Sequence, residues 1–189
     1  RLAEALFLNS FRIDRLMSKK ESKKAVIIGG GGHAKVTIEA LASSGAVEII
    51  GIIDSNPDLA GALVESTLVI GGDDRLRELS HEGVTHYIIG VGSTGNAAPR
   101  KRLFEMASEL GLIPISAVHP DASVAESAKI GAGTLICAGT VINPDVTVGE
   151  NVIVNIGVSI VHDSVIGDHT HLAPGATLGG NVHVGPMAH

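Results

Sequence analysis

His162 and Asp163 are adjacent side chains of types suited to general base catalysis. Histidine is the only side chain whose unperturbed pKa lies close to neutral pH, so it can take up and release a proton there. A neighbouring carboxylate can orient the imidazole while it removes a proton from an amine or hydroxyl group that attacks a carbonyl carbon. A backbone N–H near Gly180 could stabilise the resulting oxyanion. We interpret the pair as a candidate site for acyl transfer; the alternative is a solvated polar face.

The segment that carries this pair has a period of six residues. From Val124 to His189 the chain divides into 11 hexads, and the first position of every hexad is Val, Ile or Leu. The fifth position is always Ala, Ser, Thr or Val. Neither an α-helix nor an ordinary strand has this period. A left-handed parallel β-helix of hexapeptide repeats does, with each hexad forming one wall of a triangular prism. The first residue is then expected in the core and the fifth near the corner.

Three hexads make one coil of such a prism, so residues 18 apart in the sequence are expected to stack. This stacking puts Gly180 over His162 and His189 over His171. His162 and His171 are half a coil apart, so they could converge only across a subunit boundary or through one extended ligand. Prisms with this repeat usually pack side by side as trimers, so we expect a homotrimer, and the clefts between its prisms would suit a long molecule such as CoA. Because the chain stops at a hexad boundary, we also expect further coils in the parent protein.

The N-terminal half alternates short apolar runs with helical segments, which is typical of a parallel sheet with crossover helices. The expected strands cover residues 24–29, 47–54, 67–72, 85–92 and 112–118, and the expected helices cover residues 36–44, 73–80 and 99–110. We therefore expect a Rossmann-like α/β domain over residues 23–118 and the β-helix over residues 119–189. Residues 1–22 are expected to be an N-terminal extension.

A Gly-rich turn follows the first expected strand. Gly29, Gly31 and Ala34 match the pattern Gly-x-Gly-x-x-Gly/Ala, and Asp54 ends the next strand. Backbone N–H groups at the start of the following helix favour a phosphate or diphosphate, and Lys35 adds a positive charge. Asp54 could accept hydrogen bonds from a ribose or a base. The pattern also fits an NAD-dependent oxidoreductase, but the hexads offer no hydride-transfer site, so we favour a nucleotide sugar bound against Gly31.

The composition excludes several classes of partner. The formal net charge is −6, so no general attraction to nucleic acid is expected. No apolar run is long enough to span a bilayer. Apolar residues make up 44% of the chain and aromatic residues only 2%, which suits thin, regular layers filled by aliphatic side chains. Cys137 is the only cysteine, so an intrachain disulfide is impossible and we expect a cytoplasmic protein.

Four stretches of the chain carry a resemblance to a known family. They are GGGGHAK at the Gly-rich turn, the strand that ends in Asp54, HPDASV before the hexads, and NIGVSIVHDSVIGDHTHLAPGATLGGNVHVG. Together they resemble the bacterial sugar acetyltransferases of the NeuD/PglD/PerB type. The resemblance implies a Rossmann-like domain that binds a nucleotide-linked amino sugar and a trimeric β-helix that binds acetyl-CoA, for surface glycan synthesis. O-acetylation of a sugar such as sialic acid is the alternative within the family.

The same resemblance implies roles for single residues. His162 corresponds to the catalytic base and Asp163 to its acidic partner, which is Glu in some members. His171 and Gly180 correspond to positions that contact acetyl-CoA, and Asn155 corresponds to an active-site Asn. Three residues of the N-terminal half are implied to surround the diphosphate and the base, namely His33, Lys35 and Asp54.

Two other functions remain open. A metal-dependent hydratase of the carbonic anhydrase kind also uses this prism, and it needs three zinc ligands, for which His162, His171 and His189 are available. That class has no Gly-rich N-terminal domain. The second alternative is a non-catalytic scaffold or binding protein, in which replacing His162 would change no measurable activity.

Overall fold

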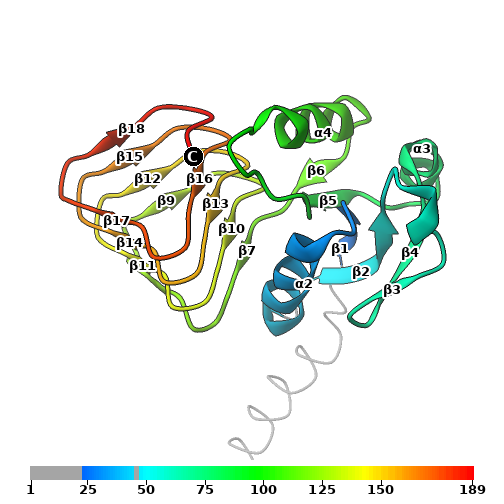
Figure 1. The fold of residues 1–189 in the computed structure, drawn as a ribbon, viewed down its shortest axis with the longest axis horizontal. Coiled ribbons are helices and arrows are strands. Elements are labelled where there is room, and N and C mark those ends of the chain that lie inside the picture. The colour runs from blue at the N-terminus through cyan, green and yellow to red at the C-terminus, as the bar shows by residue number, and fades with distance from the viewer. Residues whose placement is uncertain (1–22, 45–46) are drawn as a thin grey trace, which may run out of the picture.

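The computed structural model describes residues 23–44 and 47–189, so the expectations for residues 1–22 lie outside the described part of the chain. Figure 1 shows two parts side by side, an α/β domain and a triangular stack of coils that we call the prism (β7 to β18). The expected architecture, a Rossmann-like parallel α/β domain followed by a left-handed parallel β-helix, is confirmed.

The α/β domain contains a six-stranded sheet in the order β3-β4-β2-β1-β5-β6. Neighbouring strands are parallel except for the antiparallel pair β3 and β4. The strands are β1 (Lys23–Ile28), β2 (Val47–Ile53), β3 (Leu63–Val64), β4 (Thr67–Gly71), β5 (His86–Ile89) and β6 (Ile113–Pro114). The helices are α2 (Gly32–Ser44), the 3₁₀ helix η1 (Pro57–Leu59), α3 (Asp73–His81) and α4 (Ala98–Glu109). Residues 25–28 of β1 and 86–89 of β5 are all buried, because helices cover both faces of the sheet.

Three details of this domain differ from the expectation. The strand expected over residues 85–92 is β5, which ends at Ile89, so residues 90–92 belong to the following loop. The sequence does not predict β3, because a strand of two residues carries no periodic signal. The single strand expected over residues 112–118 is two strands, β6 in the sheet and β7 (Ala117–Val118) in the prism. Pro114 has no N–H to donate, which confines it to the edge of the sheet. The chain therefore enters the prism at Ala117, just before the division expected after residue 118.

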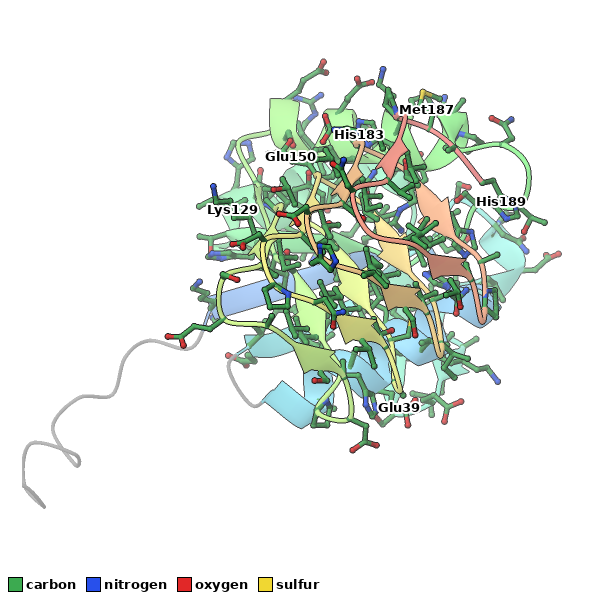
Figure 2. The ribbon with its side chains drawn as sticks, turned by 90° about the vertical axis from the view of Figure 1, so that its left-hand side faces the viewer. Glu39, Lys129, Glu150, His183, Met187 and His189 are labelled. Carbon is green, nitrogen blue, oxygen red and sulfur yellow. The ribbon has the colours of Figure 1, made fainter. Side chains whose placement is uncertain are left out.

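The prism has three walls of four parallel strands each. The first wall contains β7, β10 (Leu135–Ile136), β13 (Ile153–Val154) and β16 (His171–Leu172). The second contains β8 (Ser123–Val124), β11 (Val141–Ile142), β14 (Ser159–Ile160) and β17 (Thr177–Leu178). The third contains β9 (Lys129–Ile130), β12 (Thr147–Val148), β15 (Val165–Ile166) and β18 (His183–Val184), and Figure 2 shows Lys129 and His183 at its two ends. Paired residues are 18 apart, as in Ile153 with His171, so the expected stacking is confirmed.

The side chains at the first and fifth hexad positions lie where the sequence predicts. First-position residues such as Ile136 and Val154 form the buried core of the prism. The fifth-position residues Thr134 and Ser164 are also buried, and each hydroxyl donates to a backbone carbonyl oxygen 15 residues further along the chain. Small side chains are required at this position because they lie close to the backbone of the next coil.

The first wall and the α/β domain share one hydrophobic core. Helix α2 packs against β7 and β10. Ala34 and Ile38 of this helix belong to the same buried cluster as Leu135 and Cys137 of the prism. The position of the Gly-rich turn relative to the first wall is therefore set by side-chain packing.

Candidate active site

His162 lies in the turn between β14 and β15, and its imidazole ring is hydrogen-bonded to the side chain of Asp163. Nδ1 of His162 is 2.7 Å from Oδ2 of Asp163, and both side chains are exposed. An ionised carboxylate only accepts hydrogen bonds, so Nδ1 carries the proton of the neutral ring and Nε2 keeps its lone pair. The two side chains thus meet as the sequence suggests, and Nε2 has the geometry to take a proton from a nucleophile.

The backbone around this corner determines how the two side chains meet. Asp163 has a φ of 61°, in the left-handed region, as do Asp145 in the preceding coil and Asn181 in the next. Asp and Asn visit this conformation more readily than most residues. Gly180 lies against the imidazole, because a Cβ atom there would be 3.0 Å from both Nε2 and Cε1 of His162. The predicted stacking of Gly180 over His162 is confirmed, and it keeps the space beside Nε2 open.

His171, on β16, connects the prism to the α/β domain. Its Nδ1 is within hydrogen-bond distance of the carbonyl oxygen of Ser93, in the loop after β5. A carbonyl oxygen only accepts, so Nδ1 is the donor, and Nε2 accepts from Nδ2 of Asn155 at 2.9 Å. Oδ1 of Asn155 in turn accepts from the backbone N–H of Ile156 at 2.8 Å. Two of the predicted site residues, Asn155 and His171, are therefore joined in one chain of hydrogen bonds.

The surroundings of His171 favour its neutral form. Burial lowers the pKa of His171, and the charges of His189 and Arg100 lower it further, while the hydrogen bond to Ser93 acts in the opposite direction. The rings of His171 and His189 meet edge to face with centroids 4.8 Å apart, as the stacking predicts. His171 is thus suited to a fixed hydrogen-bonding role at neutral pH.

The Gly-rich turn is braced by Asp54. The backbone N–H of Gly30 donates to Oδ2 of Asp54 at 2.6 Å, and that of Asn56 donates to Oδ1 at 2.8 Å. Gly29 has a φ of 106°, and a Cβ atom there would overlap Val91. At Gly31, by contrast, an added Cβ atom would meet nothing within 4 Å, so a ligand can approach the backbone at the start of α2.

His33 and Lys35 follow in the first turns of α2 and point to different surroundings. Burial lowers the pKa of His33 to about 4, and the charges of Arg100 and His171 contribute to this shift. Its ring lies beside Gly92, where an added Cβ atom would be 3.5 Å from Cβ of His33. Lys35 is exposed, and its Nζ lies 3.6 Å from Oε1 of Glu65. An exposed pair of this kind is weak, so Lys35 can turn toward an anionic ligand at little cost.

The sequence does not single out the loop after β5, which we call the β5 loop (residues 90–97). Ser93 of this loop accepts from His171, and Gly92 borders His33. A signal was available, because the loop reads GVGSTGNA and follows the strand next to β1. The carboxyl ends of neighbouring parallel strands meet at one edge of a sheet, which is where such sheets bind ligands.

The candidate residues form two separate groups in one chain. His162, Asp163 and Gly180 form the corner group, in and above the turn between the second and third walls. The other group lies along the first wall and the Gly-rich turn. Figure 1 shows the β14–β15 corner pointing away from the α/β domain. The prediction that His162 and His171 lie on different faces is therefore confirmed.

The structure also bears on the metal alternative. Within residues 23–44 and 47–189, no three His, Cys, Asp or Glu side chains lie close enough to hold a metal ion together. The three histidines considered as zinc ligands thus do not meet in one chain. In the same residues, no helix has the length and apolar character needed to cross a membrane.

Comparison with known proteins identifies both parts of the chain. Residues 24–107 match the PglD N-terminal domain, and residues 145–180 match the bacterial transferase hexapeptide repeats. GDP-perosamine N-acetyltransferase of Escherichia coli is 34% identical over 83 residues, which are 44% of this chain and 38% of that protein. The chain thus spans well under half the length of this curated relative.

Solved structures resemble the whole described architecture. A histidine-to-asparagine mutant of perosamine N-acetyltransferase from Caulobacter crescentus, in complex with CoA and GDP-perosamine, is 35% identical with a TM-score of 0.77. The match covers 85% of this chain and 73% of that chain. The acetyltransferase domain of PglB from Neisseria gonorrhoeae, in complex with acetyl coenzyme A, is 28% identical with a TM-score of 0.72, over 87% of this chain and 86% of that chain.

Proposed function

This chain belongs to the NeuD/PglD/PerB family of bacterial sugar acetyltransferases, and we propose that it transfers the acetyl group of acetyl-CoA to the amino group of a nucleotide-linked amino sugar. The observation that carries the proposal is the contact of 2.7 Å between Nδ1 of His162 and Oδ2 of Asp163, with Nε2 open beside Gly180. The similarity to proteins named perosamine N-acetyltransferases supports an amino group, rather than a hydroxyl group, as the acceptor in this chain.

The reaction needs one base that can also return its proton. The amine nitrogen attacks the thioester carbonyl carbon, and Nε2 of His162 removes the amine proton as the C–N bond forms. Asp163 stabilises the imidazolium through Nδ1, and a backbone N–H near Gly180 donates to the oxyanion. The C–S bond then breaks, and His162 passes its proton to the sulfur of CoA. The products are the acetamido sugar and free CoA.

The remaining residues have binding roles in this proposal. The open backbone at Gly31 and the start of α2 receives the diphosphate, with Lys35 and His33 beside it. Asp54 braces the turn and faces the ribose or base. Asn155 orients the acceptor, and His171, which is 8% exposed, contacts acetyl-CoA.

The separation of the two groups supports an active site shared between subunits of a homotrimer. His162 lies between β14 and β15, and Figure 1 shows this corner pointing away from the α/β domain of the same chain. A nucleotide sugar bound at Gly31 therefore needs the corner of a neighbouring chain. The prism also exposes large aliphatic side chains, including Val141 at 41% and Ile156 at 53% exposure, which a subunit interface would cover. We assign the protein to the cytoplasm, because a chain with a single cysteine forms no intrachain disulfide and suits a reducing compartment.

The test is a measurement of free CoA released from acetyl-CoA with GDP-, UDP- and dTDP-linked amino sugars. We expect release with at least one of these acceptors, and its loss in His162→Ala. His183→Ala is the matched control, because His183 is an exposed histidine on the same prism and lies outside both groups. Release only with hydroxyl acceptors such as sialic acid would assign O-acetylation. Equal activity of His162→Ala and the native protein would refute the assignment of the base.

A further inference from the structure

Arg100, in the first turn of α4, is buried between the α/β domain and the prism with 1% of its surface exposed. Its Nη1 donates to the carbonyl oxygens of Ile89 and Val91, each at 2.8 Å. Its Nε donates to the carbonyl oxygen of Asn151 at 3.3 Å. A single guanidinium group therefore links Ile89 and Val91, at the end of β5, to Asn151 at a corner of the prism, and we call this link the joint.

This arrangement is costly, which argues against a merely stabilising role. All three hydrogen-bond partners of Arg100 are neutral carbonyl groups, and no carboxylate lies within ion-pair distance of it among the described residues. Burial lowers the pKa of Arg100 to about 9, so the group still carries its charge at neutral pH. Nη2 is buried without a hydrogen-bond partner. Burying a charged group without an opposite charge beside it costs free energy that neutral hydrogen-bond partners only partly offset.

On the α/β side, the bonded carbonyl groups lie where the β5 loop begins. Ile89 and Val91 flank Gly90, and a Cβ atom at Gly90 would be 2.5 Å from the carbonyl oxygen of Gly29. Two residues beyond Val91, the carbonyl oxygen of Ser93 accepts from His171. The segment that Arg100 holds is therefore packed between the Gly-rich turn and the first wall.

On the prism side, the corner that Arg100 contacts is held by further side-chain contacts. Asn151 is fully buried, has a φ of 53°, and its Nδ2 lies 3.0 Å from Nδ1 of His169. Phe104, one turn further along α4, packs edge-on against the His169 ring with centroids 5.6 Å apart. Two side chains of α4, Arg100 and Phe104, thus contact the same corner of the prism.

We propose that Arg100 is a positioning residue for acetyl transfer: it holds the β5 loop and the Gly-rich turn at a set distance from the prism, which carries the acetyl-CoA. The proposal rests on the proposed function, in which the sugar at the Gly-rich turn meets the acetyl group in a cleft between the first wall of the same chain and the corner group of a neighbouring chain. Misplacement by about 1 Å can cost roughly 10²-fold in rate. Arg100 acts on the relative position of two sites and touches neither substrate.

The kinetic test compares Arg100→Ala and Arg100→Lys with Arg102→Ala, an exposed arginine of the same helix that serves as the matched control. In Arg100→Ala we expect kcat to fall by roughly 10²-fold while both KM values change little, because each substrate still finds its own site. Lysine keeps the charge but cannot reach three carbonyl groups, so Arg100→Lys should remain impaired. Millimolar guanidinium should restore kcat of Arg100→Ala by filling the cavity, and should not raise kcat of the native protein. Unchanged kcat, or a loss that guanidinium does not restore, would overturn the proposal.

A second measurement does not depend on activity. Backbone amide hydrogen exchange in Arg100→Ala should accelerate together in residues 90–97 and 149–155, and guanidinium should reverse both changes, while exchange in β12 and β15 stays as in the native protein. If the native protein acetylates no amino sugar but exchange accelerates in both segments and guanidinium reverses it, the proposed function is wrong and the structural role of the joint is supported. If neither segment responds, the joint is refuted whatever the substrate.

Discussion

Nδ1 of His171 donates a hydrogen bond to the carbonyl oxygen of Ser93, a residue 78 positions earlier in the chain. This bond links β16, the fourth strand of the first wall, to the β5 loop. Because Nδ1 is committed to Ser93, Nε2 must accept from Asn155, which orients the amide of that residue as well. One contact between the two parts therefore determines the tautomer of a histidine and the orientation of a neighbouring side chain.

Replacement of Asp163 by Asn should abolish the basicity of His162 without unfolding the corner. Asn tolerates the φ of 61°, but its amide can donate to Nδ1 and thereby leave the ring proton on Nε2. We expect kcat to fall by roughly 10²-fold or more. Asp145→Asn is the control, because Asp145 has the same φ of 61° in the preceding coil. Equal losses of kcat in both variants would show that activity depends on the backbone at these corners and not on the His162–Asp163 pair.

A methyl group at position 180 should crowd the base. In Gly180→Ala the new Cβ atom lies 3.0 Å from Nε2 of His162, so the ring must move by a few tenths of an ångström. We expect kcat to fall by roughly tenfold, with little change in thermal stability because both residues are exposed. Gly179→Ala is the matched control, since a Cβ atom there meets nothing within 4 Å. Full activity of Gly180→Ala would show that Gly180 does not border the active site.

Stability should decrease in mild acid through His33. Its pKa is lowered from 6.5 to about 4, so the unfolded chain takes up the proton first as the pH falls. The contribution to the free energy of unfolding is complete above pH 6.5 and is lost as the pH falls toward about 4. The loss is of the order of 1–3 kcal/mol. Urea titrations across this range should show a shallower decline for His33→Asn than for the native protein, whereas His183→Asn should follow the native curve.

In Asn155→Asp, a carboxylate oxygen replaces the amide Nδ2 that donates to Nε2 of His171, so two acceptors face each other. A proton on Nε2 would remove this repulsion, and the substitution should therefore raise the pKa of His171. We expect a loss of about 1–3 kcal/mol in unfolding free energy at alkaline pH, and a smaller loss in mild acid. Asn96→Asp is the control, because Asn96 is exposed and acts only as an acceptor toward Ala98. A loss that does not depend on pH would contradict the assigned hydrogen-bond directions.

A site shared between subunits predicts complementation. His162→Ala and His33→Ala chains should each be inactive, and their co-expression should restore part of the activity, because some mixed trimers pair an intact corner group with an intact Gly-rich turn. His162→Ala with Asp163→Asn should restore nothing, since both changes lie in the corner group. If neither mixture regains activity although mixed trimers form, the site lies within a single chain.

Much of this protein could be predicted from its sequence because it is encoded locally. The period of six specifies the walls and the stacking of residues 18 apart, so Gly180 over His162 and His189 over His171 follow from counting. Side-chain direction in each short strand depends only on position within the hexad. The strand-turn-helix pattern likewise predicts the Gly-rich turn, and adjacency alone suggests the pair His162–Asp163.

Only the tertiary structure decided what lies between the two parts. The burial of Arg100, the bond from His171 to Ser93 and the contact of His33 with the β5 loop join residues far apart in sequence, and no periodic pattern encodes them. Their physical cause is the packing of α2 and α4 against the prism, which is a property of the two surfaces together. Local periodicity specifies each part because its interactions repeat along the chain; the joint between the parts occurs once, and only close packing determines it.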